Sequence, residues 1–466
     1  MKNTMKNQIK KYTLQLIMVI LAVTIQACDD FVTVDAPNSQ LTTPAVFEDA
    51  LTATVALTDI YAKMRENGFL SGRPNGFTCL AGTYSDELIS FEMGNNTSES
   101  FFNNALLSTN ASINTLWRNS YNQIYAANAV IEGVDNATAL SEAVKNQIKG
   151  EALFIRALLH FQLMSVFGDV PYITTTDYNQ NSTVERMDTE QVFQQLISDL
   201  ENAITRVNIT YLDSGRIRPN KAAIQALLAR VYLYHGDYAE ASNMASAVLN
   251  ETALYQLEQN LNEEFLKQSS ATIWQLSPGA TGANTYEGNS FIFFTGPPSK
   301  FALSAELVAQ FENNDLRKLH WVKQITNGSQ VWYHAYKYKK DMATPSSVEN
   351  SIVLRLAEQY LIRAEARAKQ GELIGAKEDL NTIRQRAGLP NTFAITAEEI
   401  LTAIQQERRL ELFTELGHRF LDLKRLGQLD TVLGSKPGWS NTDQLWPLPQ
   451  AEMDANPFLV PQNPGY

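Results

Sequence analysis

The stretch that most constrains how this chain can fold is Ile404 to Gly427, IQQERRLELFTELGHRFLDLKRLG, where apolar and charged residues alternate at helical spacing. The apolar positions that recur on one side are Leu401, Ile404, Leu412, Phe413 and Leu416. This spacing predicts a helix that packs one face inward. We expect Gly417 to end that helix.

Two carboxylates stand among these apolar residues. Glu407 and Glu411 lie one helical turn apart on a common face, where they repel each other unless cations lie close to both. The cations nearest in sequence are Arg408, Arg409, Arg419, Lys424 and Arg425. A balanced charge cluster beside a buried face is more typical of an ion network that fixes the fold than of a catalytic acid pair.

The same residues carry a family resemblance. ERRLELFTELGHRFLDLKRLG resembles the C-terminal signature of the SusD/RagB family, surface lipoproteins of Bacteroidetes that capture nutrients. Three further stretches, Leu445 to Tyr466, Glu151 to Pro171 and Arg355 to Glu372, are similar to other segments of that family and occur in its order. The resemblance implies a scaffold of tetratricopeptide-like helix pairs.

The N-terminus has the features of a lipoprotein leader. Four lysines precede a short apolar run, Leu14 to Ala22, which is too short to span a bilayer. Ile25 to Cys28, IQAC, matches a lipobox, so we expect a signal peptide over residues 1–27 and lipidation of Cys28. We expect residues 28–40 to form an acidic tether, and the resemblance implies that the anchoring membrane is the outer membrane.

The remainder, residues 41–466, is predicted to be one domain of mainly α class, with loop-rich insertions at 68–110 and 255–350 and a few short strands. Strand-like runs occur at Ala271 to Leu276 and Asn289 to Phe294. The expected helices are Phe47 to Glu66, Ser112 to Val134, Leu140 to Phe167, Thr189 to Val207, Asn220 to His235, Tyr238 to Leu249, Ala357 to Lys369, Ile374 to Ala387 and Ala397 to Leu416.

A repeat lies within these helices. Gly236 and Gly371 stand at equivalent points of two helix pairs, each followed by an acid, a bulky residue and then alanine. Small residues let two helices approach closely and glycine turns the chain between them, as in a tetratricopeptide hairpin.

The composition excludes some classes of binding partner. The chain has a net charge of −12, which argues against nucleic acid or anionic lipid headgroups as ligands. Cys28 and Cys79 are the only cysteines, so acylation of Cys28 would exclude an internal disulfide, and we expect Cys79 in the core.

The two insertions are the predicted binding region, because long irregular stretches rich in aromatic, Asn and Gly residues are usually functional. Aromatic rings can stack on sugars while Asn, Asp and Arg bind hydroxyl groups, so we expect a carbohydrate platform. Tyr286, between glycines and polar residues, and Trp332, after an NGS turn, are the main candidates. Asn95 lies in the first insertion, and the resemblance adds Asp86, Phe101 and Phe102 as ligand contacts.

Several other aromatic residues are predicted to be structural. Trp117 and Trp274 lie in helical and strand patterns typical of a core. Phe291, Phe293 and Phe294 are likewise expected to be buried.

No catalytic signature is present. The five histidines are scattered, with no H-E-x-x-H, and no P-loop, G-x-S-x-G or dinucleotide fingerprint occurs, so we expect neither a metal nor a cofactor. The sequence therefore predicts a binding protein that captures an oligosaccharide. The resemblance implies delivery to a SusC-like TonB-dependent transporter. Peptide capture, as by RagB, a surface glycoside hydrolase and a scaffold that binds only protein remain alternatives.

Overall fold

The computed structural model describes residues 46–92 and 96–466, of which Phe47–Tyr466 form one compact unit. The predicted leader, tether and lipidated Cys28 lie outside the described residues, as does Asn95.

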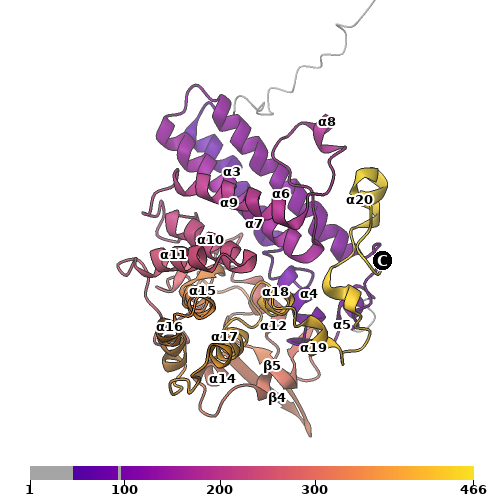
Figure 1. Ribbon diagram of the computed structural model, residues 1–466, viewed down its shortest axis with the longest axis vertical. Coiled ribbons are helices and arrows are strands. Elements are labelled where there is room, and N and C mark those ends of the chain that lie inside the picture. Colours follow the sequence, from indigo (N-terminus) through magenta and orange to yellow (C-terminus); the bar gives the residue numbers. More distant parts are fainter. Residues whose placement is uncertain (1–45, 93–95) are drawn as a thin grey trace, which may run out of the picture. The chain divides into compact units, whose positions relative to one another are not determined.

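The unit is mainly helical, and all nine expected helices are present (Figure 1). Eight of them match their predicted ends within three residues. The long helices are α3 (Ala50–Glu66), α6 (Ala111–Asn136), α7 (Glu142–Phe167), α9 (Thr189–Ile204), α10 (Lys221–His235), α11 (Tyr238–Leu249), α15 (Leu356–Lys369), α16 (Leu373–Arg386) and α17 (Ala397–Glu411).

Successive helices pack in pairs. α6 packs on α7, α10 on α11, and α15 on α16, while α7–α9 and α11–α15 contacts join the pairs into one array. Gly236 and Gly371, at the turns of two pairs, have φ angles of +98° and +82°, which glycine adopts without the steric cost that a side chain imposes. The predicted tetratricopeptide-like hairpins are thus confirmed.

α7 packs against both α6 and α9. It is the one helix of the described residues long and apolar enough to cross a membrane, but its whole apolar window is buried inside the protein. Its composition is therefore that of a core helix.

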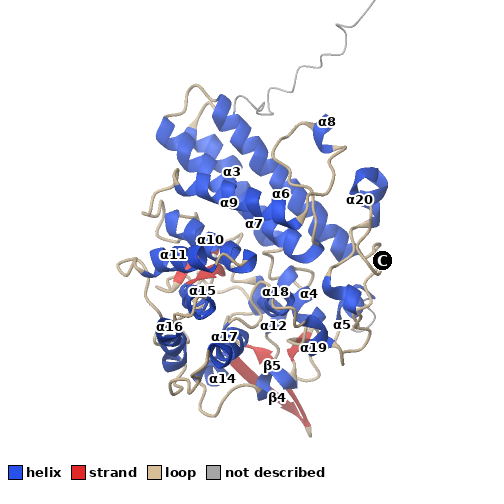
Figure 2. Ribbon diagram, viewed as in Figure 1, coloured by secondary structure: helices blue, strands red, loops and turns tan. Residues whose placement is uncertain are grey.

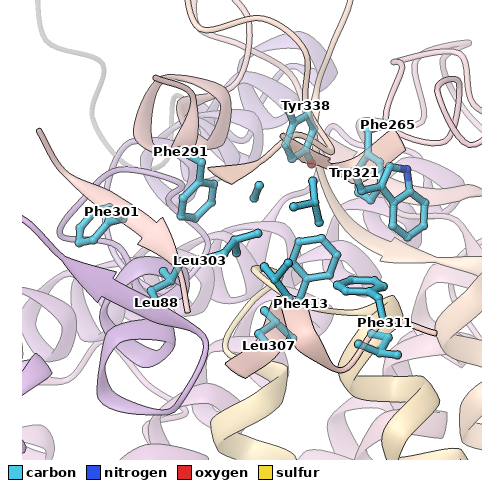
Figure 3. Packing of buried hydrophobic residues seen from close by; sticks show 14 of the residues in the cluster. Leu88, Phe265, Phe291, Phe301, Leu303, Leu307, Phe311, Trp321, Tyr338 and Phe413 are labelled. Carbon is cyan, nitrogen blue, oxygen red and sulfur yellow. The ribbon is translucent and has the colours of Figure 1, made fainter. Parts of the chain in front are cut away.

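A four-stranded sheet has the order β1 (Leu88–Ser90), β3 (Phe301–Leu303), β5 (Gln330–Ala335), β4 (Val322–Asn327), and β2 (Thr272–Leu276) pairs antiparallel with β6 (Ser351–Arg355). The β4–β5 hairpin lies at the end of the unit far from α3 and α6, whereas the β2–β6 pair contacts α10 (Figure 2). Phe413, which follows α17, packs against this sheet with Leu303, Leu307, Phe311 and Trp321 (Figure 3).

The insertions contain more regular structure than the sequence suggests. The first contains α4 (Phe77–Tyr84) and α5 (Asn96–Phe102), besides β1.

The other short helices, inside and outside the insertions, are α8 (Tyr178–Asn181), α12 (Tyr286–Phe291), α13 (Ala305–Ala309), α14 (Leu316–Trp321), α18 (His418–Arg425), α19 (Leu429–Leu433), η1 (Asn441–Gln444), α20 (Gln450–Ala455) and η2 (Pro457–Leu459).

Two predicted elements are wrong. The strand expected over Asn289 to Phe294 is replaced by α12, because the Thr285 side chain accepts a hydrogen bond from Gly288 and starts a helix there. α17 ends at Glu411, six residues before Gly417, and Gly417 precedes the next helix, α18. A Cβ at Gly417 would lie 2.5 Å from the ring of Phe77, so glycine permits close packing of α18 on α4.

The ion network predicted around α17 is confirmed, but the partners of its two carboxylates come from other elements. Glu411 is fully buried and contacts Arg317, Arg355 and Arg386, while Glu407 pairs with Arg317 and Arg384. The cations near in sequence pair elsewhere: Arg408 and Arg425 with Asp422, and Arg409 and Arg419 with Asp86. Lys424 donates to a backbone carbonyl.

Candidate ligand-binding surface

Tyr286 is the first residue of α12 and is half-buried. Its hydroxyl donates to Glu66 Oε2 at 2.5 Å, and Arg73 donates to the same Glu66 oxygen at 2.6 Å. The Arg73 guanidinium carbon lies 3.9 Å from the centre of the Tyr286 ring, within cation–π range. Arg73 therefore covers one face of the ring and fixes its orientation.

The charges of this group are mutually stabilising. Partial burial alone would raise the pKa of Glu66, but hydrogen bonds from Tyr286, Arg73 and Arg65 lower it to about 2. The same burial and the bond to Glu66 raise the pKa of Tyr286. At neutral pH the group is therefore an ionised carboxylate between a tyrosine hydroxyl and two arginines.

Tyr286 lines a surface hollow of about 440 Å³. The hollow is shaped by two side-chain amides: Asn284 donates to Met342 O at 3.0 Å and Asn289 donates to Asp341 O at 3.2 Å. Met342 is 71% exposed. We call this region the Tyr286 hollow; its main lining residues are Arg73, Asn284, Tyr286, Asn289, Asp341 and Met342.

Trp332 lies on β5, in the hairpin that β5 forms with β4. It is half-buried, and its ring packs over Gly296, where a Cβ would come within 2.1 Å of it. His334, two residues on along β5, has its ring centre 4.9 Å from that of Phe293 and 5.6 Å from that of Tyr336. We define Phe293, Trp332, His334 and Tyr336 as the hairpin aromatic cluster.

The hollow and the cluster are joined by α12. Tyr286 begins this helix and Phe293 follows it by two residues, so their Cα atoms are at most roughly 15 Å apart. Trp332 packs over Gly296, which follows Phe293 by three residues, so the segment 286–296 connects Tyr286 with the residue that Trp332 contacts.

The buried role predicted for Phe293 and Phe294 is wrong. Phe293 is half-buried and Phe294 is 71% exposed, because the chain leaves α12 at Ile292 and no strand orders these residues inward. The core positions of Phe291, Trp274, Trp117 and Cys79 are confirmed.

The remaining predicted site residues lie elsewhere. Phe101 is fully buried, with its ring centre 4.9 Å from that of Trp446, so its place is in the core and it is not available to a ligand. Phe102 is half-buried, and the Lys436 ammonium nitrogen lies 5.3 Å from the centre of its ring. Asp86 accepts from Arg419 Nε and Arg409 Nη2, both at 2.7 Å, which occupies both of its oxygens.

Sequence reasoning missed Arg73, Asn284, Asn289 and Asp341, which surround Tyr286. Arg73, Asn284 and Asp341 lie in irregular segments, and Asn289 lies in α12, which is too short to show a helical period. The only available signal was their proximity to Gly and Asn residues, which is too common to select them. Over the residues that the structure describes, no group of three or more His, Cys, Asp or Glu side chains could hold a metal ion.

Family models match most of the chain. A model described as "Starch-binding associating with outer membrane" matches residues 33–233, and one described as "SusD family" matches residues 282–466. SusD-like protein P2 of Formosa agariphila is 26% identical over 98% of this chain and 100% of its own length. The starch-binding protein SusD of Bacteroides thetaiotaomicron is 23% identical over 72% of this chain and 75% of that protein.

Solved structures share the fold. A SusD superfamily protein from Bacteroides vulgatus superimposes with a TM-score of 0.79 at 24% identity, covering 90% of this chain and 99% of that one. A laminarin-binding SusD-like protein superimposes with a TM-score of 0.75 at 25% identity, covering 89% of this chain and 99% of that one. With the two family models in chain order and the same helical architecture, the chain belongs to the SusD/RagB family.

Proposed function

We propose that this protein binds an oligosaccharide along α12, between the Tyr286 hollow and the hairpin aromatic cluster. The observation that carries the proposal is that half-exposed rings and amide and charged groups from several segments surround the two ends of α12. Sugar rings have apolar faces that stack on aromatic side chains, and hydroxyl edges that need donors and acceptors.

The two parts would have different tasks. Trp332 and Phe293 present ring surface at the hairpin, and Phe294 beside them is exposed. In the hollow, Arg73 and Asp341 supply charged groups for hydroxyl contacts. The Arg73–Glu66–Tyr286 network holds its side chains before any ligand arrives, which lowers the entropy lost on binding.

A glycoside hydrolase is less well supported at this site. A glycosidase needs a carboxyl group that is protonated near neutral pH to donate to the leaving oxygen. Glu66, the carboxylate bonded to Tyr286, has a pKa of about 2 and is suited to orienting its neighbours instead. Burial raises the pKa of Glu287 to about 7, but this side chain is buried and accepts a hydrogen bond from Ser351, away from the surface hollow.

The names of the relatives favour a glycan over a peptide. One curated relative is a starch-binding protein and one structural relative binds laminarin. A peptide-binding groove would be expected to offer a row of exposed backbone donors and acceptors, as an unpaired strand does. At the Tyr286 hollow the carbonyls of Asp341 and Met342 are instead taken by side-chain amides.

The remaining parts of the proposal rest on the sequence. A lipobox at Cys28 supports an anchor in the outer membrane, in line with the description of the matching family model. Family membership supports a SusC-like TonB-dependent transporter as the partner that receives the glycan.

Ligand class can be tested by native electrophoresis of the soluble chain, beginning after Cys28, through gels that contain starch, laminarin or no polysaccharide. We expect at least one polysaccharide to retard the protein, and soluble oligosaccharides of the same linkage to release it. If neither gel retards the protein and a tryptic peptide digest binds saturably in calorimetry, the ligand is a peptide and the glycan proposal is wrong.

A further inference from the structure

A second cavity, of about 520 Å³, lies where α7, α9, α10 and α18 meet the C-terminal segment. Its volume is in the range of small-molecule binding sites. Its walls are largely apolar and include Met164, Phe193, Leu421 and Leu445, the last of which belongs to the C-terminal segment. None of these residues belongs to the Tyr286 hollow or the hairpin aromatic cluster.

One side chain of the wall carries an unpaired charge. The Lys424 ammonium donates to Ser165 O at 2.7 Å and forms no ion pair with any described residue. Burial lowers the pKa of Lys424 to about 7, with no neighbouring carboxylate to oppose it. An ammonium group has three donors, so two remain for a ligand.

The other cations of the wall differ in how they are satisfied. Arg425 is neutralised by Glu365 and Asp422, at 2.6 and 2.8 Å. Arg186 donates to the carbonyls of Asp169 and Pro461 and to Asn463 Oδ1, so each of its three nitrogens has an acceptor, whereas the Lys424 ammonium has one acceptor for three donors. Lys424 is therefore the cation of this wall that most lacks an acceptor.

Two hydroxyl groups at the cavity also lack partners. Ser165 is 8% exposed, lines the cavity, and its Oγ has no hydrogen-bond partner among the described residues. The Tyr234 hydroxyl is buried and likewise without a described partner, and Tyr234 also lines the cavity. Unsatisfied buried polar atoms are costly, so the wall beside Lys424 is not optimised for stability alone.

We propose that this cavity binds a small molecule that carries a carboxylate on an apolar body. The carboxylate would accept from the two remaining donors of the Lys424 ammonium. The apolar body would lie against Phe193, Leu421 and Leu445. An inorganic anion would leave most of these apolar walls uncovered.

The test is isothermal titration calorimetry at pH 6 of the full chain in detergent micelles, with blank micelles subtracted. The probes are benzoate and hexanoate, with benzyl alcohol as the neutral analogue. For probes of about nine heavy atoms we expect one site with a Kd on the order of 1 mM, and binding of benzyl alcohol at least tenfold weaker.

Three variants make the test specific. Lys424→Met keeps the length of the side chain and should weaken benzoate binding at least tenfold. Leu445→Trp should block the cavity without changing its charge, which decides the matter if Lys424→Met does not fold. Lys436→Met is the matched control: Lys436 is also bonded to carbonyls and has a pKa lowered to about 7 by burial, but it lies outside the cavity.

Binding that is lost in Lys424→Met and Leu445→Trp, and kept in Lys436→Met, supports the proposal. Equal affinity for benzoate and benzyl alcohol, unchanged binding in Leu445→Trp, or no saturable heat up to roughly 20 mM of either carboxylate would overturn it. None of these results depends on whether the protein binds a glycan.

Discussion

Replacing Glu411 by Gln is the sharpest test of how α17 organises the fold. Glu411 is fully buried, with Arg355 Nη1 at 2.6 Å, Arg317 Nη1 at 3.3 Å and Arg386 in direct contact. Burial alone would raise the pKa of Glu411, but these arginines hold it far below its usual value. Glutamine keeps the shape and removes the charge, so three buried guanidinium groups lose a shared counter-ion.

The expected loss of stability is about 3–5 kcal/mol, the usual effect of removing one partner from a buried ion pair. The entropy of unfolding is about 2.1 cal/mol/K per residue, so in a unit the length of Phe47–Tyr466 each kcal/mol lowers Tm by about 1 °C. We therefore predict a decrease in Tm of about 3–6 °C in differential scanning calorimetry at pH 7.

The matched control is Asp59→Asn. Asp59 pairs with Lys63 on the surface of α3, where the two side chains are 55% and 58% exposed. Exposed pairs contribute about 0–1 kcal/mol, so its Tm should fall by about 1 °C or less. If Glu411→Gln melts within 1 °C of the wild type, the network does not hold α17 in place and the reasoning fails.

Three further predictions concern packing and pH. Phe101→Ala should lower the free energy of unfolding by about 3–5 kcal/mol, because its ring is fully buried, yet change glycan affinity less than twofold at 25 °C in calorimetry. Gly417→Ala should lower that free energy by about 1–3 kcal/mol in urea denaturation, because the new methyl group would lie 2.5 Å from the Phe77 ring; unchanged stability would contradict the close packing of α18 on α4. Burial raises the pKa of Glu87 to about 8, so the folded chain keeps a proton that the unfolded chain loses near pH 4.5, and stability should fall between those values as pH rises. Glu87→Gln should flatten that fall in melts from pH 5 to 8; an unchanged slope would show that Glu87 is not its source.

The helical scaffold was readable from the sequence because its helices are long and amphipathic or uniformly apolar. α9 has a clear apolar face, and the capping box at Thr396 and Glu399 marks the start of α17. Short elements were harder to predict. α12 has only six residues, so its apolar positions fit a strand as well as a helix.

The ion network around α17 was also only partly predictable from the sequence. That Glu407 and Glu411 needed cations followed from their spacing, but the partners Arg317, Arg355 and Arg386 come from other parts of the chain. The sequence predicted only part of the candidate site, for a related reason. Tyr286 stood out by its polar surroundings, while its partner Glu66, at the end of α3, looked like any other surface acid of a helix.

The most direct test of glycan binding at α12 is calorimetry of the soluble chain with the oligosaccharide that releases it from the polysaccharide gel. The variants are Trp332→Ala and Tyr286→Ala, with Tyr178→Ala as the control because Tyr178 is 80% exposed on α8. We expect each of the first two to weaken binding at least tenfold, equivalent to about 1.4 kcal/mol, and the control to bind as the wild type does. Wild-type affinity in both Trp332→Ala and Tyr286→Ala would contradict the account and place the glycan on another surface.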